Sequence, residues 1–207
     1  LTLAIFLLAC PSTVAGQEEE RLIVDMHGGL GHSDNIGRDF RDPQSSAFQV
    51  VGTDFGYARD RARLAASVNG NLELRRYSND DAVRDTEQVW GSADAFLGVA
   101  IVPDMLSWDT EYQYGQARTD PLAPIGPNNV EPLRIFTTGP RLHIPIANRT
   151  TLRARAVYTD RDFGTTERLS GETKVFEAGV FRSLTRTNQI GLEFVHSESD
   201  FDQRTQN

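Results

Sequence analysis

The histidines are the side chains best suited to metal binding or proton transfer at neutral pH, and the sequence contains 4 of them. His27 and His32 lie close together but lack the intervening glutamate of a zinc-binding helix, and His143 and His196 each stand alone in an alternating segment. Cys10 is the single cysteine, which excludes an internal disulfide and a cysteine-based zinc site. We therefore expect no metal site.

Other short motifs match known sites only in part. Gly28–Gly31 follows an apolar segment but lacks the last glycine of a dinucleotide-binding fingerprint and opens no helix. Asp162–Gly164 spells the magnesium-binding triplet of protein kinases without the glycine-rich loop and lysine that accompany it. Residues 198–202 lack the glycine and the closing glutamate of a calcium loop. We expect no catalytic or cofactor-binding residue, no cofactor and no enzymatic activity.

After these motifs are excluded, the remaining candidates are charged residues that would lie together on the polar face of extended strands. Such residues would point together into the lumen of a barrel, where charges of both signs pair with one another or line a water-filled path. We favour pairing, because the two signs occur in similar number. The expected lumen-lining residues are Arg63, Glu73, Arg75, Asp94, Asp109, Glu111, Arg153, Arg155 and Glu193.

Alternation of apolar and polar residues with a period of two predicts the strands that would carry these charges. In the clearest segment, Leu64 to Leu74, apolar residues alternate with polar ones such as Asn69 and Glu73. No segment shows a helical stripe, so the predicted fold class is all-β, an antiparallel meander of about nine strands. The predicted strands cover residues 21–31, 47–58, 62–75, 87–102, 106–115, 133–144, 151–158, 173–183 and 188–198.

The lengths of strands and connections distinguish two all-β architectures. Strands of soluble sandwiches usually have about five or six residues, whereas a tilted strand that crosses a bilayer needs about ten, as these segments have. Short and long connections alternate, which is typical of a bacterial outer-membrane barrel. Aromatic residues near strand ends could form its interfacial girdles or occupy a core: Tyr57, Tyr77, Trp90, Trp108, Tyr112 and Tyr158. Short connections are expected at 59–61, 103–104, 147–149 and 184–187, and long ones near 32–45, 78–86, 117–132 and 160–171.

The composition is that of an ordinary folded chain, with 39% hydrophobic and 24% charged residues. The formal net charge of −8 argues against a nucleic-acid-binding surface, which needs clustered lysine and arginine. No stretch approaches the roughly 18 consecutive apolar residues of a membrane-spanning helix. These features exclude a helical membrane protein but are compatible with a membrane β-barrel.

The amino-terminal segment predicts secretion. Leu1 to Ala9 has the character of the apolar region of a signal peptide, and the small residues up to Gly16 supply a cleavage site. Because no initiator methionine or basic region precedes it, we expect a partial signal peptide at 1–16 and a barrel domain at 17–207. The residues before Cys10 also resemble a lipobox, so lipidation of Cys10 is the alternative processing route.

The expected number of strands predicts an incomplete barrel. Bacterial single-chain barrels have an even number of strands, and about nine would leave an edge with unpaired backbone groups. The chain ends in the polar residues Arg204 to Asn207, without a terminal aromatic residue. We therefore expect the barrel domain to be truncated at its carboxyl end, with strand 188–198 at an open edge.

The most distinctive part of the sequence lies between Leu106 and Leu142. It includes Leu-Ser-Trp-Asp at 106–109, Thr-Asp-Pro-Leu-Ala-Pro at 119–124 and Ile-Phe-Thr-Thr-Gly-Pro at 135–140. From about Asp34 to Asn207 the chain resembles a family of uncharacterised proteobacterial outer-membrane β-barrel proteins associated with the PEP-CTERM and exosortase protein-sorting system. The resemblance implies genes near exopolysaccharide loci and a longer full-length protein, and it carries over no biochemical activity and no catalytic residues.

The leading hypothesis is a non-enzymatic protein of the bacterial outer membrane, with an export, anchoring or structural role beside an exopolysaccharide or exosortase sorting system. Expected partners are outer-membrane lipid, the barrel assembly machinery and polysaccharide or sorting-system components, but no nucleic acid. The alternatives are a soluble or lipid-anchored β-sandwich binding module at the cell surface and an outer-membrane enzyme. The outer-membrane barrel and the β-sandwich differ in the surroundings of four side chains, which face lipid in the barrel and a protein core in the sandwich: Leu64, Leu72, Trp108 and Tyr112.

Overall fold

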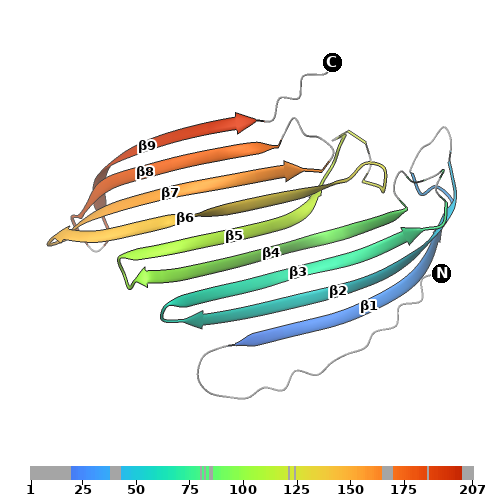
Figure 1. Ribbon diagram of the computed structural model, residues 1–207, viewed down its shortest axis with the longest axis horizontal. Helices are drawn as coiled ribbons and strands as arrows, with labels where there is room; N and C mark the ends of the chain where they lie inside the picture. The colour runs from blue at the N-terminus through green and yellow to red at the C-terminus, as the bar shows by residue number, and fades with distance from the viewer. Residues whose placement is uncertain are drawn as a thin grey trace.

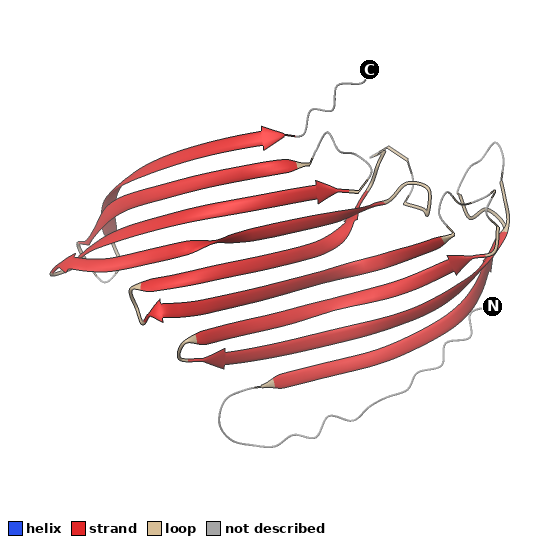
Figure 2. Cartoon of the chain, in the orientation of Figure 1, coloured by secondary structure: helices blue, strands red, loops and turns tan. Residues whose placement is uncertain are grey.

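The computed structural model describes residues 20–37, 43–79, 81, 83, 86–120, 122–123, 125–164, 170–185 and 187–201. The expected signal peptide at 1–16, Cys10 and the terminal residues 204–207 lie outside this part of the chain. The described residues form β-strands joined by turns and loops (Figure 2). None of the described segments is a helix long and apolar enough to cross a membrane.

One antiparallel sheet contains nine strands, arranged side by side in the order in which they follow along the chain (Figure 1). This is the predicted all-β meander, and it is confirmed. The strands are β1 (Arg21–Ser33), β2 (Ser46–Arg61), β3 (Leu64–Tyr77), β4 (Glu87–Val102), β5 (Leu106–Ala117), β6 (Glu131–Ala147), β7 (Thr150–Phe163), β8 (Gly171–Ser183) and β9 (Gln189–Phe201).

Several strands extend further than the sequence pattern predicted. β7 continues to Phe163 rather than residue 158, because the charged residues 160–162 obscure the alternation although their backbone still pairs with β6. The short connection expected at 59–61 is wrong: these residues belong to β2, since Asp60 pairs with Ala65 and Arg61 with Leu64. The tight turn therefore lies at 62–63.

Short turns and long loops lie at opposite ends of the sheet, as predicted (Figure 1). Asp104 and Arg149 have φ angles of 60° and 64°, the left-handed conformation that tight hairpin turns often require. The short turns are 62–63, 103–105, 148–149 and 184–188, and the long loops are 34–45, 78–86, 118–130 and 164–170.

The ladder between β6 and β7 is interrupted at Gly139 and Pro140. Pro140 has no backbone N–H to donate, and a Cβ atom on Gly139 would lie 1.9 Å from the carbonyl oxygen of Ala156. A glycine is therefore required where the two strands approach each other here.

The sheet does not close on itself in the described part of the chain. β1 pairs only with β2, and β9 pairs only with β8, so these two are the edge strands. The prediction of an open sheet with the last strand at its edge is confirmed. Such an edge presents a row of backbone donors and acceptors that another strand can pair with.

Candidate functional site on the polar face of the sheet

The pairing register sorts the side chains onto two faces, because directly paired residues of neighbouring strands point to the same side. One of these, the apolar face, carries hydrophobic side chains on every strand. Its exposed members include Leu22, Leu30, Val51, Leu74, Leu97, Trp108, Tyr112, Phe136, Phe176, Val180, Leu192 and Phe194.

The apolar face is not covered by any described segment. Leu30 is 69% exposed and Leu192 is 84% exposed, and the buried hydrophobic residues of the described chain are Tyr77 and Val83, in a small cluster near the long loops. Leu64, Leu72, Trp108 and Tyr112 all lie on the apolar face. No second sheet packs against these side chains within the described residues.

The opposite face, the polar face, has the less exposed side chains on β8 and on the halves of β1 and β2 nearer the long loops, so the sheet curves toward this face. His27 of β1 and Glu73 of β3 meet across β2, with 3.3 Å between Nε2 and Oε1. Gly52 of β2 lies beneath this contact, and a Cβ atom there would be 2.3 Å from His27 Nε2. Side chains from strands that are not neighbours converge in this way where a sheet curves toward them.

The residues predicted to line a lumen lie on the polar face, apart from Arg63. Arg63 occupies the turn between β2 and β3, where its carbonyl oxygen accepts a hydrogen bond from the N–H of Ala100. Those on the polar face are Glu73, Arg75, Asp94, Asp109, Glu111, Arg153, Arg155 and Glu193.

Glu73 is the centre of a group of charged contacts on β1, β2 and β3. Arg75 donates from Nε to Glu73 Oε2 at 2.9 Å, and a second hydrogen bond from its Nη2 reaches the same oxygen. His27 lies between two carboxylates, because its Nδ1 is 3.6 Å from Asp54 Oδ2 while its Nε2 faces Glu73. The charges of this group therefore pair with one another, as the pairing interpretation expects.

These contacts continue to the loop at 118–130. The guanidinium of Arg75 lies over the ring of Trp90, 4.5 Å from its centroid. Trp90 Nε1 donates to Gln88 Oε1 at 3.0 Å, and Gln88 Nε2 donates to the carbonyl oxygen of Pro127 at 3.0 Å. The loop is thus anchored to the polar face of β4.

Asn129 holds the same loop in its folded form. Its Oδ1 accepts hydrogen bonds from Thr119 Oγ1 and from the N–H of Asp120, both at 2.7 Å, and its Nδ2 donates to the carbonyl oxygens of Asp120 and Ala123. A Cβ atom on Gly126 would lie 3.9 Å from the carbonyl oxygen of Ile36, so the loop reaches the one at 34–45.

Beside these loops lies the small hydrophobic cluster. Val83, 1% exposed, is buried with Tyr77, and Ile36 and Phe48 pack against them. Neither this cluster nor the role of Asn129 was predicted from the sequence, because Ile36 and Val83 come from connections that are far apart in the chain. Val83, a large apolar residue within the mostly polar connection at 78–86, was the available signal.

Arginines on β6 and β7 form a second charged group on the polar face. Arg141 of β6 forms an ion pair with Asp109 of β5, with 2.8 Å between Nη2 and Oδ2. Arg153 lies over the ring of Phe181, 4.8 Å from its centroid. Arg141 is not among the predicted lumen-lining residues, because Gly139 and Pro140 interrupt the alternation just before it.

The aromatic residues considered for interfacial girdles divide between the two faces. Tyr57, Trp108, Tyr112 and Tyr158 lie on the apolar face. Tyr77 and Trp90 lie on the polar face, where Tyr77 is buried beside Val83 and Trp90 contacts Arg75, so neither belongs to a girdle on the apolar face.

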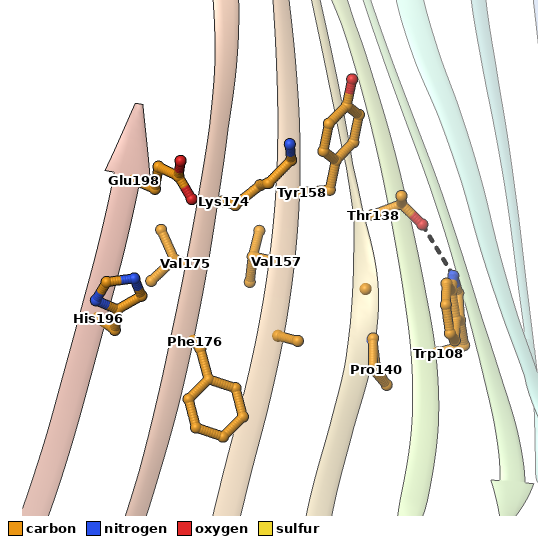
Figure 3. A pocket seen from close by; sticks show the side chains of 12 residues that line it. Trp108, Thr138, Pro140, Val157, Tyr158, Lys174, Val175, Phe176, His196 and Glu198 are labelled. Carbon is orange, nitrogen blue, oxygen red and sulfur yellow. Dashed lines mark hydrogen bonds between the residues drawn. The ribbon is translucent and has the colours of Figure 1, made fainter. Parts of the chain in front are cut away.

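A groove of about 360 Å³ crosses the apolar face from β5 to β9 (Figure 3). Trp108, Pro140 and Phe176 line one end, and Tyr158, Lys174 and Glu198 line the end nearer the long loops. Trp108 donates from Nε1 to Thr138 Oγ1 at 2.8 Å, so its polar atom is satisfied without water (Figure 3). The groove is therefore apolar toward the middle of the strands and polar toward the rim.

The described histidines are distributed over both faces. His27 belongs to the Glu73 contacts, His32 pairs with Asp34 at 3.1 Å, His143 lies beside Arg141 and Arg153, and His196 lines the groove. Among the described residues, no three His, Cys, Asp or Glu side chains are gathered in a group that could hold a metal ion.

No family model, curated protein or solved structure matches this chain.

Proposed function

We propose that this chain forms part of the wall of a bacterial outer-membrane β-barrel, with the apolar face toward lipid and the polar face toward a water-filled interior. The proposed role is non-enzymatic: an export, anchoring or structural component. We also propose that it acts beside an exopolysaccharide or exosortase sorting system. Only the sequence resemblance at 106–109, 119–124 and 135–140 supports this association.

The uncovered apolar face is the observation that carries this proposal. Nine strands spaced about 4.8 Å apart, with apolar stretches from about 14 Å on β9 (Ile190–Phe194) to about 34 Å on β3 (Leu64–Leu74), give this face an area on the order of 1,000 Å². The largest apolar patch on a typical soluble monomer is about 300–600 Å². A face of this size requires burial, and lipid can bury all of it at once.

The height of the apolar band also fits a bilayer. At ~3.4 Å per residue, the rise from Leu64 to Leu74 is about 34 Å, which corresponds to a height of about 24 Å for a strand tilted by ~45°. Outer-membrane barrels present an apolar band about 25 Å tall. Charged residues bound the band on the same face, with Arg59 and Arg61 toward the short turns and Arg76 paired with Glu87 toward the long loops.

The polar end of the groove supports the same orientation. Tyr158, Lys174 and Glu198 lie where the apolar band gives way to the long loops, which is the level of lipid headgroups in a barrel wall. A wall in lipid also requires that the outer edges of β1 and β9 pair with further strands, because each unsatisfied backbone group in hydrocarbon costs several kcal/mol.

The two tryptophans test this orientation directly, because Trp90 and Trp108 lie on opposite faces. We expect brominated phosphatidylcholine to quench the fluorescence of W90F, which retains Trp108, and to leave that of W108F largely unchanged. The measurement uses protein purified in its native assembly and reconstituted in vesicles. Equal quenching of both variants, or quenching of W108F alone, would contradict the proposed orientation.

Cell fractionation tests the location independently. We expect the protein in the dense outer-membrane fraction of a sucrose gradient. A soluble periplasmic protein whose Trp108 resists lipid quenching would instead support a β-sandwich binding module.

A further inference from the structure

The charges on the polar face are unevenly distributed across the sheet. Acidic residues lie mainly on β1 to β5, where Arg21 and Arg75 are the basic exceptions among the strand residues of this face. β6 and β7 carry arginines instead, at 141, 153, 155 and 161. The acidic residues on β1 to β5 include Asp25, Asp54, Glu73, Asp94, Asp109 and Glu111.

Within the basic part, like charges face each other across the ladder. Arg141 is the direct partner of Arg155, and Arg153 lies on the same face of β7 two residues away. Like charges placed directly opposite one another in a sheet are destabilising. Such an arrangement is relieved when an anion lies between the charges.

The arginines surround a hollow of about 170 Å³, which Glu177 and Glu193 also line. A single water occupies about 30 Å³ of liquid, so the hollow has room for a larger group. Two of the guanidinium groups contact residues that do not line the hollow. Arg141 pairs with Asp109 at 2.8 Å, and Arg153 lies over the ring of Phe181.

Arg155 differs from its neighbours. Glu177 is its partner in the β7–β8 register, yet within the described residues the structure has no ion pair or side-chain hydrogen bond at Arg155. Its donors remain available on the polar face. Guanidinium groups bind carboxylate, phosphate and sulfate through paired N–H donors, which a lysine cannot reproduce.

We propose that Arg141, Arg153 and Arg155 form a binding site for an oxyanionic group, a carboxylate, phosphate or sulfate, carried by a solute. Arg155 supplies free donors, Phe181 holds Arg153 on the same strand, and Arg141 lines the same hollow while paired with Asp109. This inference names the class of solute for the polar face, and it rests on the proposed function only for the route by which the solute arrives.

Protection from phenylglyoxal, which modifies accessible guanidinium groups, tests the site with inorganic sulfate as the probe. The modification of each arginine is quantified by peptide mass spectrometry on the detergent-solubilised native assembly. At ten times its Kd, sulfate should slow modification of Arg153 and Arg155 about tenfold by mass action, relative to chloride of equal ionic strength. Arg161 is the control, because it lies on the same face of β7 opposite Ile135 and Gly171.

Two substitutions complete the test. Arg155→Gln should raise the Kd measured from the sulfate protection of Arg153 by about tenfold or more, the loss expected for a charge-assisted hydrogen bond, while Arg161→Gln should leave this Kd unchanged. Equal protection of Arg161 and Arg155, or no protection at either, would overturn the site. Sulfate protection is measured in detergent and does not depend on contact between Trp108 and lipid. Protection of Arg155 without lipid quenching of Trp108 would therefore support this site and contradict the proposed function.

Discussion

An arginine placed on the apolar face of β4 should destabilise the protein according to its depth in the bilayer. Leu97 and Val89 are matched positions, because both lie on this face and are 44% and 47% exposed. Ala95 marks the middle of the band on β4. At ~3.4 Å per residue and a tilt of ~45°, Leu97 lies about 5 Å from this level and Val89 about 14 Å from it.

These depths predict different costs. Arginine near the midplane of a barrel wall costs about 2–4 kcal/mol, and near the interface about 0–1 kcal/mol. We therefore expect Leu97→Arg to lower the free energy of unfolding by about 2–4 kcal/mol and Val89→Arg by less than about 1 kcal/mol. Ser92→Arg, on the polar face of the same strand, should have little effect because that side chain stays in water.

The assay is urea unfolding of the native assembly in dilauroylphosphatidylcholine vesicles, followed by tryptophan fluorescence. Equal losses at Leu97 and Val89 would refute the depth argument and indicate that protein covers the apolar face. A loss at Ser92 as large as that at Leu97 would refute the assignment of the two faces.

Three further predictions concern the loops and the polar face. A cysteine at Ile125, in the loop at 118–130, should react with a membrane-impermeant maleimide on intact cells, whereas one at Asp104 in a short turn should not, and the reverse pattern would invert the topology. Gly52→Val should displace His27 from Glu73 and lower the free energy of unfolding by about 1–3 kcal/mol through overpacking, while Gly29→Ala, with open space at its Cβ, should be tolerated in the same urea assay. Asn129→Ala should speed proteolysis within 118–130 by removing the loop's internal hydrogen bonds, whereas Leu122→Ala, at a 94% exposed position, should not, and equal rates would refute the role of Asn129.

Strand identity was predictable wherever a side chain's polarity reports its face. On β3, Leu64, Val68, Leu72 and Leu74 alternate with polar residues, and the register puts them together on the apolar face. Hydrophobic alternation is strong there because apolar side chains lie on one face of the strand and polar side chains on the other. The signal fails at the rim of the sheet, where charged residues such as Asp160 and Asp162 occupy the apolar face as well.

On β4 the alternation is weak for a different reason. Gly91, Ala93 and Ala95 occupy its apolar face, whereas Trp90 and Phe96 occupy its polar face. Hydrophobicity alone therefore suggests the wrong side for the larger residues. Counting every second residue along β4 places Trp90 on the same face as Gln88, which is the polar face.

The candidate sites were predictable only as a list of residues. Parity places Glu73 and Arg75 on one face, but nothing in the sequence indicates that His27 reaches Glu73 across an intervening strand. That contact depends on curvature and on register, both of which arise from pairing along the whole sheet. The same holds for Arg141 and Arg155, which are distant in the chain until β6 and β7 pair.

Glycines beneath large side chains explain how the polar face accommodates this curvature. A Cβ atom would lie 2.4 Å from the ring of Phe48 at Gly31, 2.3 Å from His27 at Gly52, and 2.3 Å from Phe181 at Gly191. In each case the large residue and the glycine belong to neighbouring, directly paired strands. On a concave surface side chains crowd together, so a ring fits where its neighbour has no side chain. Slipping one strand by a residue would turn the glycine or the ring to the other face, which means that these pairs oppose a change of register as well as permitting the curve.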